Sequence, residues 1–296
     1  MKTILRFLGL GFAAITLVFI TNCAQSSSVA DNTNASVATT VAANSANYAE
    51  QVQAGVKYFQ AEAQKQLPLA ENLLEALKSG NMEAAKKAYV DSRPPYEQIE
   101  VLAGNFEQED TDIDARPYAF EAGEEDEAFK GFHRIEALIY RDENLQAAVP
   151  YGEGLVSSIK SLIAKLNDPS NFNAKDHFGG MIAVATEVPA KKISSEEETW
   201  SDQSLVIFKN NWIGIHSQYQ PFAELVKEKD ANLAAAVEKT YQDCLKTVEP
   251  FFTEGQVAGK PYSSINAKQR GAISDASYKF RDAIIKARDA LGISAA

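Results

Sequence analysis

Apolar residues recur every three or four positions through most of this chain, which is the spacing of one face of an α-helix. The clearest stripe runs from Val52 to Leu77, and Ser79-Gly80-Asn81 after it is typical of a helix end followed by a new N-cap. Later stripes comprise Leu155, Ile159, Leu162 and Leu166; Met181, Val184 and Val188; Leu205, Phe208, Trp212, Ile215, Tyr219 and Phe222; Leu233, Val237, Tyr241, Cys244, Val248 and Phe251; and Ile273, Phe280, Ile284 and Ile285. No alternating run bounded by hairpin turns interrupts them. We therefore predict an all-α fold of antiparallel helical bundles, with two four-helix bundles packed together.

Prolines and polar residues modify this helical pattern. Pro68 lies inside the first stripe and predicts a kink. Pro94-Pro95 predicts either an interruption of the second helix or a plain turn between two helices. The segment Ser195-Glu196-Glu197-Glu198 has the pattern of a capping box, which predicts that the next long helix begins there.

The N-terminal 22 residues have the layout of a secretory signal peptide, with an apolar run from Phe7 to Ile20 that is short for a membrane span. Cys23 stands where a bacterial lipoprotein is cleaved and acylated, but Asn22 replaces the usual small residue, so ordinary secretion is the alternative. Residues 23–45 are rich in Ser, Ala, Asn and Thr and predict a flexible, lipid-anchored linker. Residues 46–296 form the predicted helical domain, and we expect it in the periplasm.

Charge and cysteine content narrow the classes of partner. The formal charge is −11, and it becomes −13 when Lys2 and Arg6 leave with the signal peptide. Such an acidic protein is not expected to bind nucleic acid or anionic lipid, whereas cations are compatible with it. Apart from Cys23 the chain has only Cys244, so after lipidation no intramolecular disulfide is available and stability must come from packing.

Two pairs of polar residues have the spacing of neighbours on one helical face. His133 is three positions before Glu136, and Glu97 is three positions before Glu100. Residues at i and i+3 share a helical face, so the two heads of each pair can converge on one ion. The spacing alone is equally typical of a hydrogen-bonded core histidine and of exposed helix acids. Between the pairs lies a connector, residues 107–127, with ten acids and one base.

The connector has its own alternatives. Most of its acids are expected in a solvated, mobile loop. Asp110, Asp112 and Asp114 also match positions 1, 3 and 5 of a calcium-binding loop, and Glu121 matches position 12, but Ala115 stands where the sharp turn requires glycine.

The remaining charged and aromatic candidates have no ligand spacing of their own. Arg116 and Arg134 are the bases nearest in sequence and could pair with surplus carboxylates. His177 and His216 are expected to be structural or surface groups, and Tyr96 to be a packing residue.

Taken together, these segments resemble the EfeO and imelysin family of periplasmic iron-uptake proteins. The family motif G-x-H-x-x-E is matched by Gly131, His133 and Glu136, and the upstream R-x-x-Y/W-E-x-I-E element is matched by residues 93–100. The likeness extends to residues 112–116, more loosely to residues 196–202, and covers roughly residues 46 to 290. Longer members carry a cupredoxin domain ahead of the helical one, which this sequence does not provide for, so a copper-assisted redox step is not expected.

The resemblance implies that this protein binds iron, ferric or ferrous, through Glu97, Glu100, Asp114, His133 and Glu136. Four carboxylates and one imidazole form an oxygen-rich site that suits iron better than thiolate-preferring ions, although zinc or copper can compete in vitro. The resemblance further implies delivery to an inner-membrane iron permease, with a periplasmic haem peroxidase as another partner of the system.

Two other functions are alternatives. Some relatives in the family were classed as metallopeptidases, but the motif H-E-x-x-H requires a second histidine that this chain lacks near His133. We find no Ser/His/Asp or Cys/His set either, so enzymatic activity is not expected. A module that binds sugars or polyanions is known in one branch of the family, but a charge of −13 disfavours polyanions unless metal ions bridge them.

Overall fold

The computed structural model of the protein describes residues 48–195 and 197–295. The predicted signal peptide, Cys23 and nearly all of the linker lie outside these residues. Within them, helices are the regular secondary structure, and the only β-type pairing is an isolated bridge between Phe252 and Gly259. The predicted all-α class is therefore confirmed. None of the helices in this part of the chain has both the length and the apolar character needed to cross a membrane.

The helices vary greatly in length. The long ones are α2 (Ala49–Ser79), α3 (Met82–Ile99), α6 (Leu145–Lys165), α7 (Ala174–Glu187), α9 (Ser204–Tyr219), α11 (Ala231–Val248) and α12 (Ala267–Ala290). The short α-helices are α4 (Glu107–Asp114), α5 (Phe132–Glu136), α8 (Ile193–Ser195) and α10 (Ala223–Lys229). Short 3-10 helices are η1 (Glu100–Asn105), η2 (Pro117–Ala119), η3 (Gly123–Glu125), η5 (Pro169–Asn171), η7 (Gln220–Phe222), η8 (Glu249–Phe251) and η9 (Tyr262–Ser264), and two π-helical turns are η4 (Ala137–Arg141) and η6 (Val188–Lys192).

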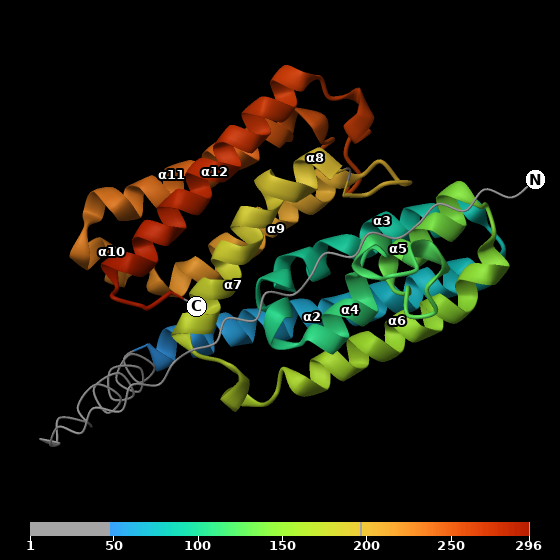
Figure 1. Ribbon diagram of the computed structural model, residues 1–296, viewed down its shortest axis with the longest axis horizontal. Coiled ribbons are helices and arrows are strands. Elements are labelled where there is room, and N and C mark those ends of the chain that lie inside the picture. Colours follow the sequence, from blue (N-terminus) through green and yellow to red (C-terminus); the bar gives the residue numbers. More distant parts are fainter. Residues whose placement is uncertain (1–47, 196, 296) are drawn as a thin grey trace, which may run out of the picture. The chain divides into compact units, whose positions relative to one another are not determined.

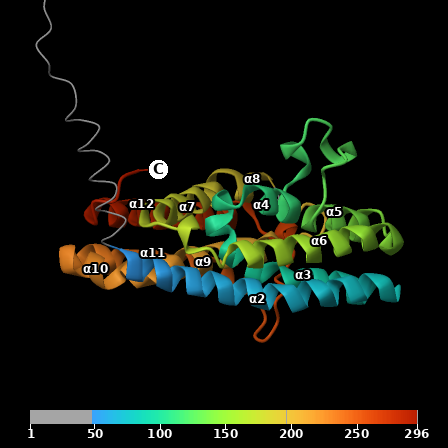
Figure 2. The same ribbon diagram turned by 90° about the horizontal axis from the view of Figure 1, so that it is seen from below.

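The long helices form two groups (Figure 1). Helix α2 packs against α3 and α6, and the short α4 and α5 cover α6. In the second group α12 packs against α7 and α11, and α9 contacts α7 and α11. Figure 2 shows α2 beside α3 and α6, and the contact of α3 with α9 joins the two groups. The division into two four-helix bundles stays a prediction, because α4 and α5 rather than a fourth long helix complete the first group.

The boundary between the first two helices follows the sequence signals. Gly80 ends α2 in the left-handed conformation, with φ 75°, which a residue without a Cβ adopts without strain. The side chain of Asn81 then caps α3 by accepting a hydrogen bond from the backbone N–H of Ala84 at 3.1 Å. The predicted stop and N-cap are confirmed.

Two other sequence predictions about helix ends are wrong. Helix α3 continues through Pro94 and Pro95 without interruption. The prolines remove two backbone donors, but α3 is held on either side of them: Tyr89 and Tyr96 are buried, and Gln66 of α2 donates to the carbonyl oxygen of Ser92 at 2.9 Å. Packing thus outweighs the lost helical hydrogen bonds.

The second wrong prediction concerns the capping box at residues 195–198. Helix α9 begins only at Ser204, and its N-cap residue Gln203 makes no side-chain cap. Glu197 and Glu198 are instead buried, among charged side chains from other helices. Helix α2 is continuous through Pro68, and the kink predicted there stays a prediction.

The two histidines without ligand spacing are structural, as expected from the sequence. His177 of α7 is fully buried, and burial lowers its pKa to about 4, so it is neutral at neutral pH. His216 of α9 contacts a carboxylate oxygen of Glu238 at 2.7 Å and stacks on the ring of Tyr241.

Two glycines allow the second group of helices to approach the end of α3 closely. A Cβ on Gly214 of α9 would lie 2.4 Å from the carbonyl oxygen of Gln98, and one on Gly180 of α7 would lie 1.7 Å from that of Val101. Both distances are far below van der Waals contact. The α3–η1 segment is therefore clamped between α7 and α9, and it is this segment that carries Glu97 and Glu100.

We expect Gly214→Ala to lower the free energy of unfolding by about 1–3 kcal/mol, because the new methyl group would push α9 away from α3. The matched control is Gly154→Ala on the exposed face of α6, where no atom lies within 4 Å of the added Cβ. That change should raise the free energy of unfolding by about 0.5–1 kcal/mol through helix propensity. Urea unfolding followed by circular dichroism measures both values, and equal effects would contradict the close crossing.

Candidate metal site

Ten charged or titratable side chains meet between the two groups of helices and form what we call the charge cluster. Its members are Glu97, Glu100, Asp114, Glu136, Glu197, Glu198, Arg93, Arg116, Lys192 and His133. All but Glu100 and Arg116 are almost completely buried. Six carboxylates against three permanent cations leave a formal excess of three negative charges when His133 is neutral.

Arg93 of α3 is the first of two cationic centres in the cluster. Its Nη2 lies 2.6 Å from Oε1 of Glu97, one helical turn further along α3. Its Nη1 lies 2.5 Å from Oδ1 of Asp114, and its Nε lies 3.0 Å from Oε1 of Glu198. The guanidinium also lies over the ring of Phe132, 4.5 Å from its centroid. One side chain thus neutralises carboxylates from α3, from α4 and from the segment before α9.

The geometry at Gly131 explains the glycine of the G-x-H-x-x-E motif. Gly131 has φ 77°, and a Cβ there would lie 2.2 Å from the carbonyl oxygen of Ile113. Glycine therefore lets the start of α5 lie directly against the end of α4. As a result, Nε2 of His133 is 3.5 Å from Oδ1 of Asp114, and its Nδ1 is 3.2 Å from Oε2 of Glu136.

Glu136 and Glu198 are held by the segment between α8 and α9. The backbone N–H groups of Trp200 and Ser201 donate to Oε1 of Glu136 at 2.9 and 2.8 Å. The hydroxyl of Ser201 donates to Oε2 of Glu198 at 2.7 Å. His133, Glu136 and Glu198 each offer one possible ligand atom, and these three atoms all lie within 4.8 Å of one another. At this spacing three side chains can hold one metal ion.

Lys192 of the π-helical turn η6 is the second cationic centre. Its Nζ lies 2.8 Å from both carboxylate oxygens of Glu100, 3.0 Å from Oε1 of Glu197 and 3.8 Å from Oε2 of Glu97. Asn211 of α9 donates from Nδ2 to Oε2 of Glu97 at 2.9 Å and to Oε2 of Glu100 at 2.7 Å. These contacts fix both acids of the Glu97 and Glu100 pair at the junction of α3 and η1.

Burial and neighbouring charges set the protonation of the cluster. Burial lowers the pKa of His133 well below its ordinary value, so the imidazole is neutral and keeps a lone pair for a metal. Burial also raises the pKa of Glu97 to about 8 and that of Glu136 well above its ordinary value. For Asp114, burial would raise the pKa, but the charge of Arg93, together with that of Arg116, holds it well below its usual range. A multivalent cation can replace protons on such acids.

The structure brings all five sequence-predicted ligands into the charge cluster, but not into one coordination sphere. Glu97, Glu100 and Asp114 contact Arg93 or Lys192, whereas His133 and Glu136 belong with Glu198 to the group whose ligand atoms are closest together. The set of five as ligands of one ion therefore stays a prediction.

Five members of the cluster were not among the predicted ligands: Arg93, Arg116, Lys192, Glu197 and Glu198. Of these, Arg116 was suggested only as a partner of surplus carboxylates. Arg93, Glu197 and Glu198 lie in stretches that resemble the family, and this resemblance was the feature of the sequence that could have identified them. Lys192 has no motif around it. Its role depends on contacts to Glu100 and Glu197, which spacing along the chain does not reveal.

The acidic connector also differs from its expected form. Residues 107–114 form α4, so Asp110, Asp112 and Asp114 are helical and the calcium-loop alternative is wrong. Arg116 pairs with Glu197, as the suggestion about surplus carboxylates anticipated. Arg134 instead lies over the rings of Phe129 and Tyr151.

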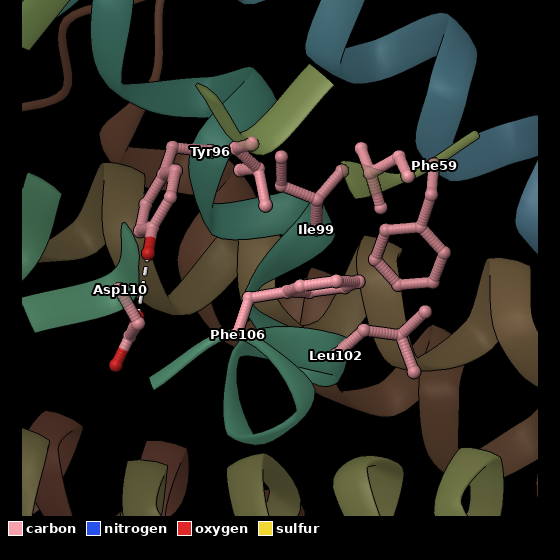
Figure 3. Close-up of a pocket in the computed structure, with 8 residues that line it drawn as sticks. Phe59, Tyr96, Ile99, Leu102, Phe106 and Asp110 are labelled. Atoms are coloured by element: carbon pink, nitrogen blue, oxygen red, sulfur yellow. Dashed lines mark hydrogen bonds between the residues drawn. The ribbon is translucent and has the colours of Figure 1, made fainter. Parts of the chain in front are cut away.

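Asp110 separates a small apolar cavity from an acidic cleft. In Figure 3 the hydroxyl of Tyr96 points to Asp110, and the two are hydrogen-bonded at 2.5 Å, while Phe106 and Leu102 line the apolar side. Burial raises the pKa of Asp110 to about 7. On its other side a cleft of about 360 Å³ is lined by four acids, Glu100, Asp110, Asp176 and Glu187.

Comparison with known proteins identifies the family. The family model described as imelysin matches residues 24–286. The chain belongs to the imelysin family. It is 29% identical over 221 residues to an EfeM/EfeO family lipoprotein of Staphylococcus haemolyticus, which covers 74% of this chain and 76% of the relative.

Two other imelysin relatives are named for iron uptake. The identity is 31% over 180 residues to the iron uptake system component EfeM of Pseudomonas syringae pv. syringae, covering 61% of this chain and 63% of EfeM. It is 26% over 236 residues to the iron uptake system component EfeO of Escherichia coli, covering 80% of this chain and 62% of EfeO. The chain thus spans less than two thirds of the length of EfeM and of EfeO.

We expect Arg93→Met to lower the free energy of unfolding by about 3–5 kcal/mol, because three buried carboxylates would lose their common cation. Arg141→Met is the matched control: Arg141 is 38% exposed and pairs with Glu124 and Asp142, so its loss should cost about 0–1 kcal/mol. Urea unfolding of both variants at pH 7 tests this. Similar small losses would show that Arg93 does not hold the cluster together.

Proposed function

We propose that this protein binds iron as a component of an extracytoplasmic iron-uptake system and passes the ion to an inner-membrane permease. The observation that carries the proposal is the convergence of His133, Glu136 and three further predicted ligands in one buried cluster that has more carboxyl groups than permanent cations. The relatives EfeM and EfeO, named as iron uptake system components, support the same assignment.

The chemistry of the donor set supports iron. Glu97, Glu100, Asp114, His133 and Glu136 are the proposed ligands, and Glu198 is a further one because of its distance to His133 and Glu136. Carboxylate oxygens with one neutral imidazole suit ferric and ferrous iron, whereas the free cysteine Cys244 is buried in α11, outside the cluster. Zinc and copper are expected to compete in vitro.

A binding protein is favoured over an enzyme. The relatives reported above are named as uptake components or lipoproteins, and a peptidase label attached to the family is a name only. The group of closest ligand atoms in the described residues contains one histidine, whereas the peptidase motif supplies two. No contact or cavity of the described residues favours the peptidase or the sugar-binding alternative.

We expect the double variant Glu100→Gln, Glu136→Gln to lose iron affinity by more than about 100-fold, because one carboxylate ligand is removed from each end of the cluster. His133→Ala should cost less and shift selectivity away from zinc, since the remaining carboxylates still hold a hard cation. Calorimetric titration with Fe³⁺ supplied as its nitrilotriacetate complex measures these affinities.

The matched control for this titration is Glu121→Gln, Glu127→Gln, which removes two exposed acids of the acidic connector, residues 107–127. It should bind iron as the wild type does. Wild-type affinity in the Glu100, Glu136 double variant would mean that the cluster is an internal salt-bridge network and not a metal site.

The proposed location is the outer face of the inner membrane or another extracytoplasmic membrane surface, with Cys23 as the lipid anchor. Two staphylococcal relatives are named as lipoproteins, which supports this. A flexible linker of about 20 residues would span about 25 Å, enough for the domain to reach a permease in the same membrane. A periplasmic haem peroxidase is the other proposed partner of the system.

We expect Cys23→Ala to move the protein from the membrane fraction to the soluble periplasmic fraction, because the acylation site is lost. Cys244→Ala is the control, since Cys244 is buried in the helical domain and should not affect localisation. Cell fractionation with immunodetection distinguishes the two. Retention of the Cys23 variant in the membrane would contradict lipidation.

A further inference from the structure

The ammonium group of Lys192 is surrounded by carboxylates in the way that a bound cation would be. Nζ lies 2.8 Å from both oxygens of Glu100 and 3.0 Å from Oε1 of Glu197, and Glu97 is 3.8 Å away. The lysine side chain is 1% exposed. A lysine is seldom buried so completely, and here the surrounding negative charge makes it favourable.

Two of the three acids around Lys192 are also proposed iron ligands. A metal ion binds a carboxylate oxygen at about 2.0–2.2 Å, which is shorter than the hydrogen bonds of an ammonium group. Both oxygens of Glu100 already contact Nζ, and Oε2 also accepts from Asn211. An ion that takes Glu100 as a ligand therefore competes with the ammonium group, because two cations repel each other strongly at such distances.

The acidic cleft gives a cation access to this end of the cluster. Glu100 lines the cleft, and its side chain is 10% exposed, more than that of any other proposed ligand. The other acids of the cleft, Asp110, Asp176 and Glu187, raise the local concentration of cations. Among the proposed ligands Glu100 is the one that lines this cleft, and its carboxylate contacts the buried ammonium group of Lys192.

The cleft also offers a place for the displaced ammonium group. Glu187 lines the cleft, lies at the end of α7 immediately before the turn that carries Lys192, and acts electrostatically on its charge. The four-carbon side chain of lysine is flexible enough to turn its head between nearby acids. Glu187, whose Oε1 lies 3.9 Å from Nζ of Lys191, could thus hold the ammonium while Glu97 and Glu100 act as iron ligands.

We propose that Lys192 is an internal competitor for the transported cation: its ammonium neutralises Glu100 and Glu197 when no metal is bound, leaves when iron enters, and returns as iron is released. This role rests on the proposed function. It keeps the acids paired in both states and weakens iron binding, which favours transfer of the ion to the next component.

The test compares three variants of the full-length protein by titration with Fe³⁺ nitrilotriacetate and by the rate of iron release to a chelator. Lys192→Met keeps the length of the side chain without its charge and should bind iron at least tenfold more tightly and release it more slowly. Lys192→Arg keeps a cation that can still compete and should bind no more tightly than the wild type. Lys130→Met removes a partly exposed lysine paired with Asp112 and controls for net charge.

The outcomes separate this role from the proposed function. Wild-type protein that takes up no iron refutes both. Wild-type protein that binds iron, together with a Lys192→Met variant that binds it equally or more weakly, refutes the role of Lys192 alone. A gain in affinity that Lys130→Met reproduces would also overturn it, because the effect would then be one of net charge.

A second measurement uses the wild-type protein and therefore tests the proposal even if Lys192→Met does not fold. The buried ammonium group of wild-type Lys192 should give a resolved ¹⁵Nζ–¹H signal in an NMR spectrum, since its hydrogen bonds slow proton exchange. Ga³⁺, a diamagnetic analogue of Fe³⁺, should abolish or strongly shift that signal on binding. A Lys192 signal that stays unchanged in gallium-saturated protein would overturn the proposal.

Discussion

A carboxylate that is removed from water must be paired with a cation or with hydrogen-bond donors, and this requirement governs how the helices of the protein meet. Arg93 satisfies acids from α3, from α4 and from the segment before α9, and Lys192 satisfies acids at the start of η1 and in the same segment. Neither helical group could shift on the other without leaving buried charges unpaired. The close contacts of α7 and α9 with the α3–η1 segment have the same effect.

The same requirement leads from structure to function. The cluster has more carboxylates than permanent cations, and it includes a neutral imidazole. Such a cluster does not make the fold more stable than apolar residues would, since an apolar core of the same volume would be at least as stable. A multivalent cation supplies the missing positive charge, which is why the proposed role is the binding of iron and why the internal cation Lys192 matters for its release.

The sequence was informative where the signal is local. Stripes of apolar residues predicted the long helices, and Gly80 and Asn81 marked a helix end, because both depend on neighbours within a few positions. Pro94-Pro95 was misread, since the packing that keeps α3 helical there involves α2.

For the site too, contacts between residues close in the sequence could be predicted, whereas contacts between distant residues could not. The helical pairs of Glu97 with Glu100 and His133 with Glu136 were visible in the spacing. The contact of Arg93 with Glu198 joins residues 105 positions apart and could not be seen in it. Lys192 was not predicted, because the pair Lys191-Lys192 matches no ligand spacing in the sequence.

Diffraction from crystals of the iron-loaded protein, measured with X-rays at the iron absorption edge, tests the central claim most directly. The anomalous signal locates iron without assumptions about its ligands. We predict one strong peak inside the charge cluster, in contact with His133 and with carboxylate oxygens of Glu97, Glu100, Asp114 or Glu136. A peak confined to the surface of the cleft, away from His133, or no ordered peak in protein that retains iron, would contradict it.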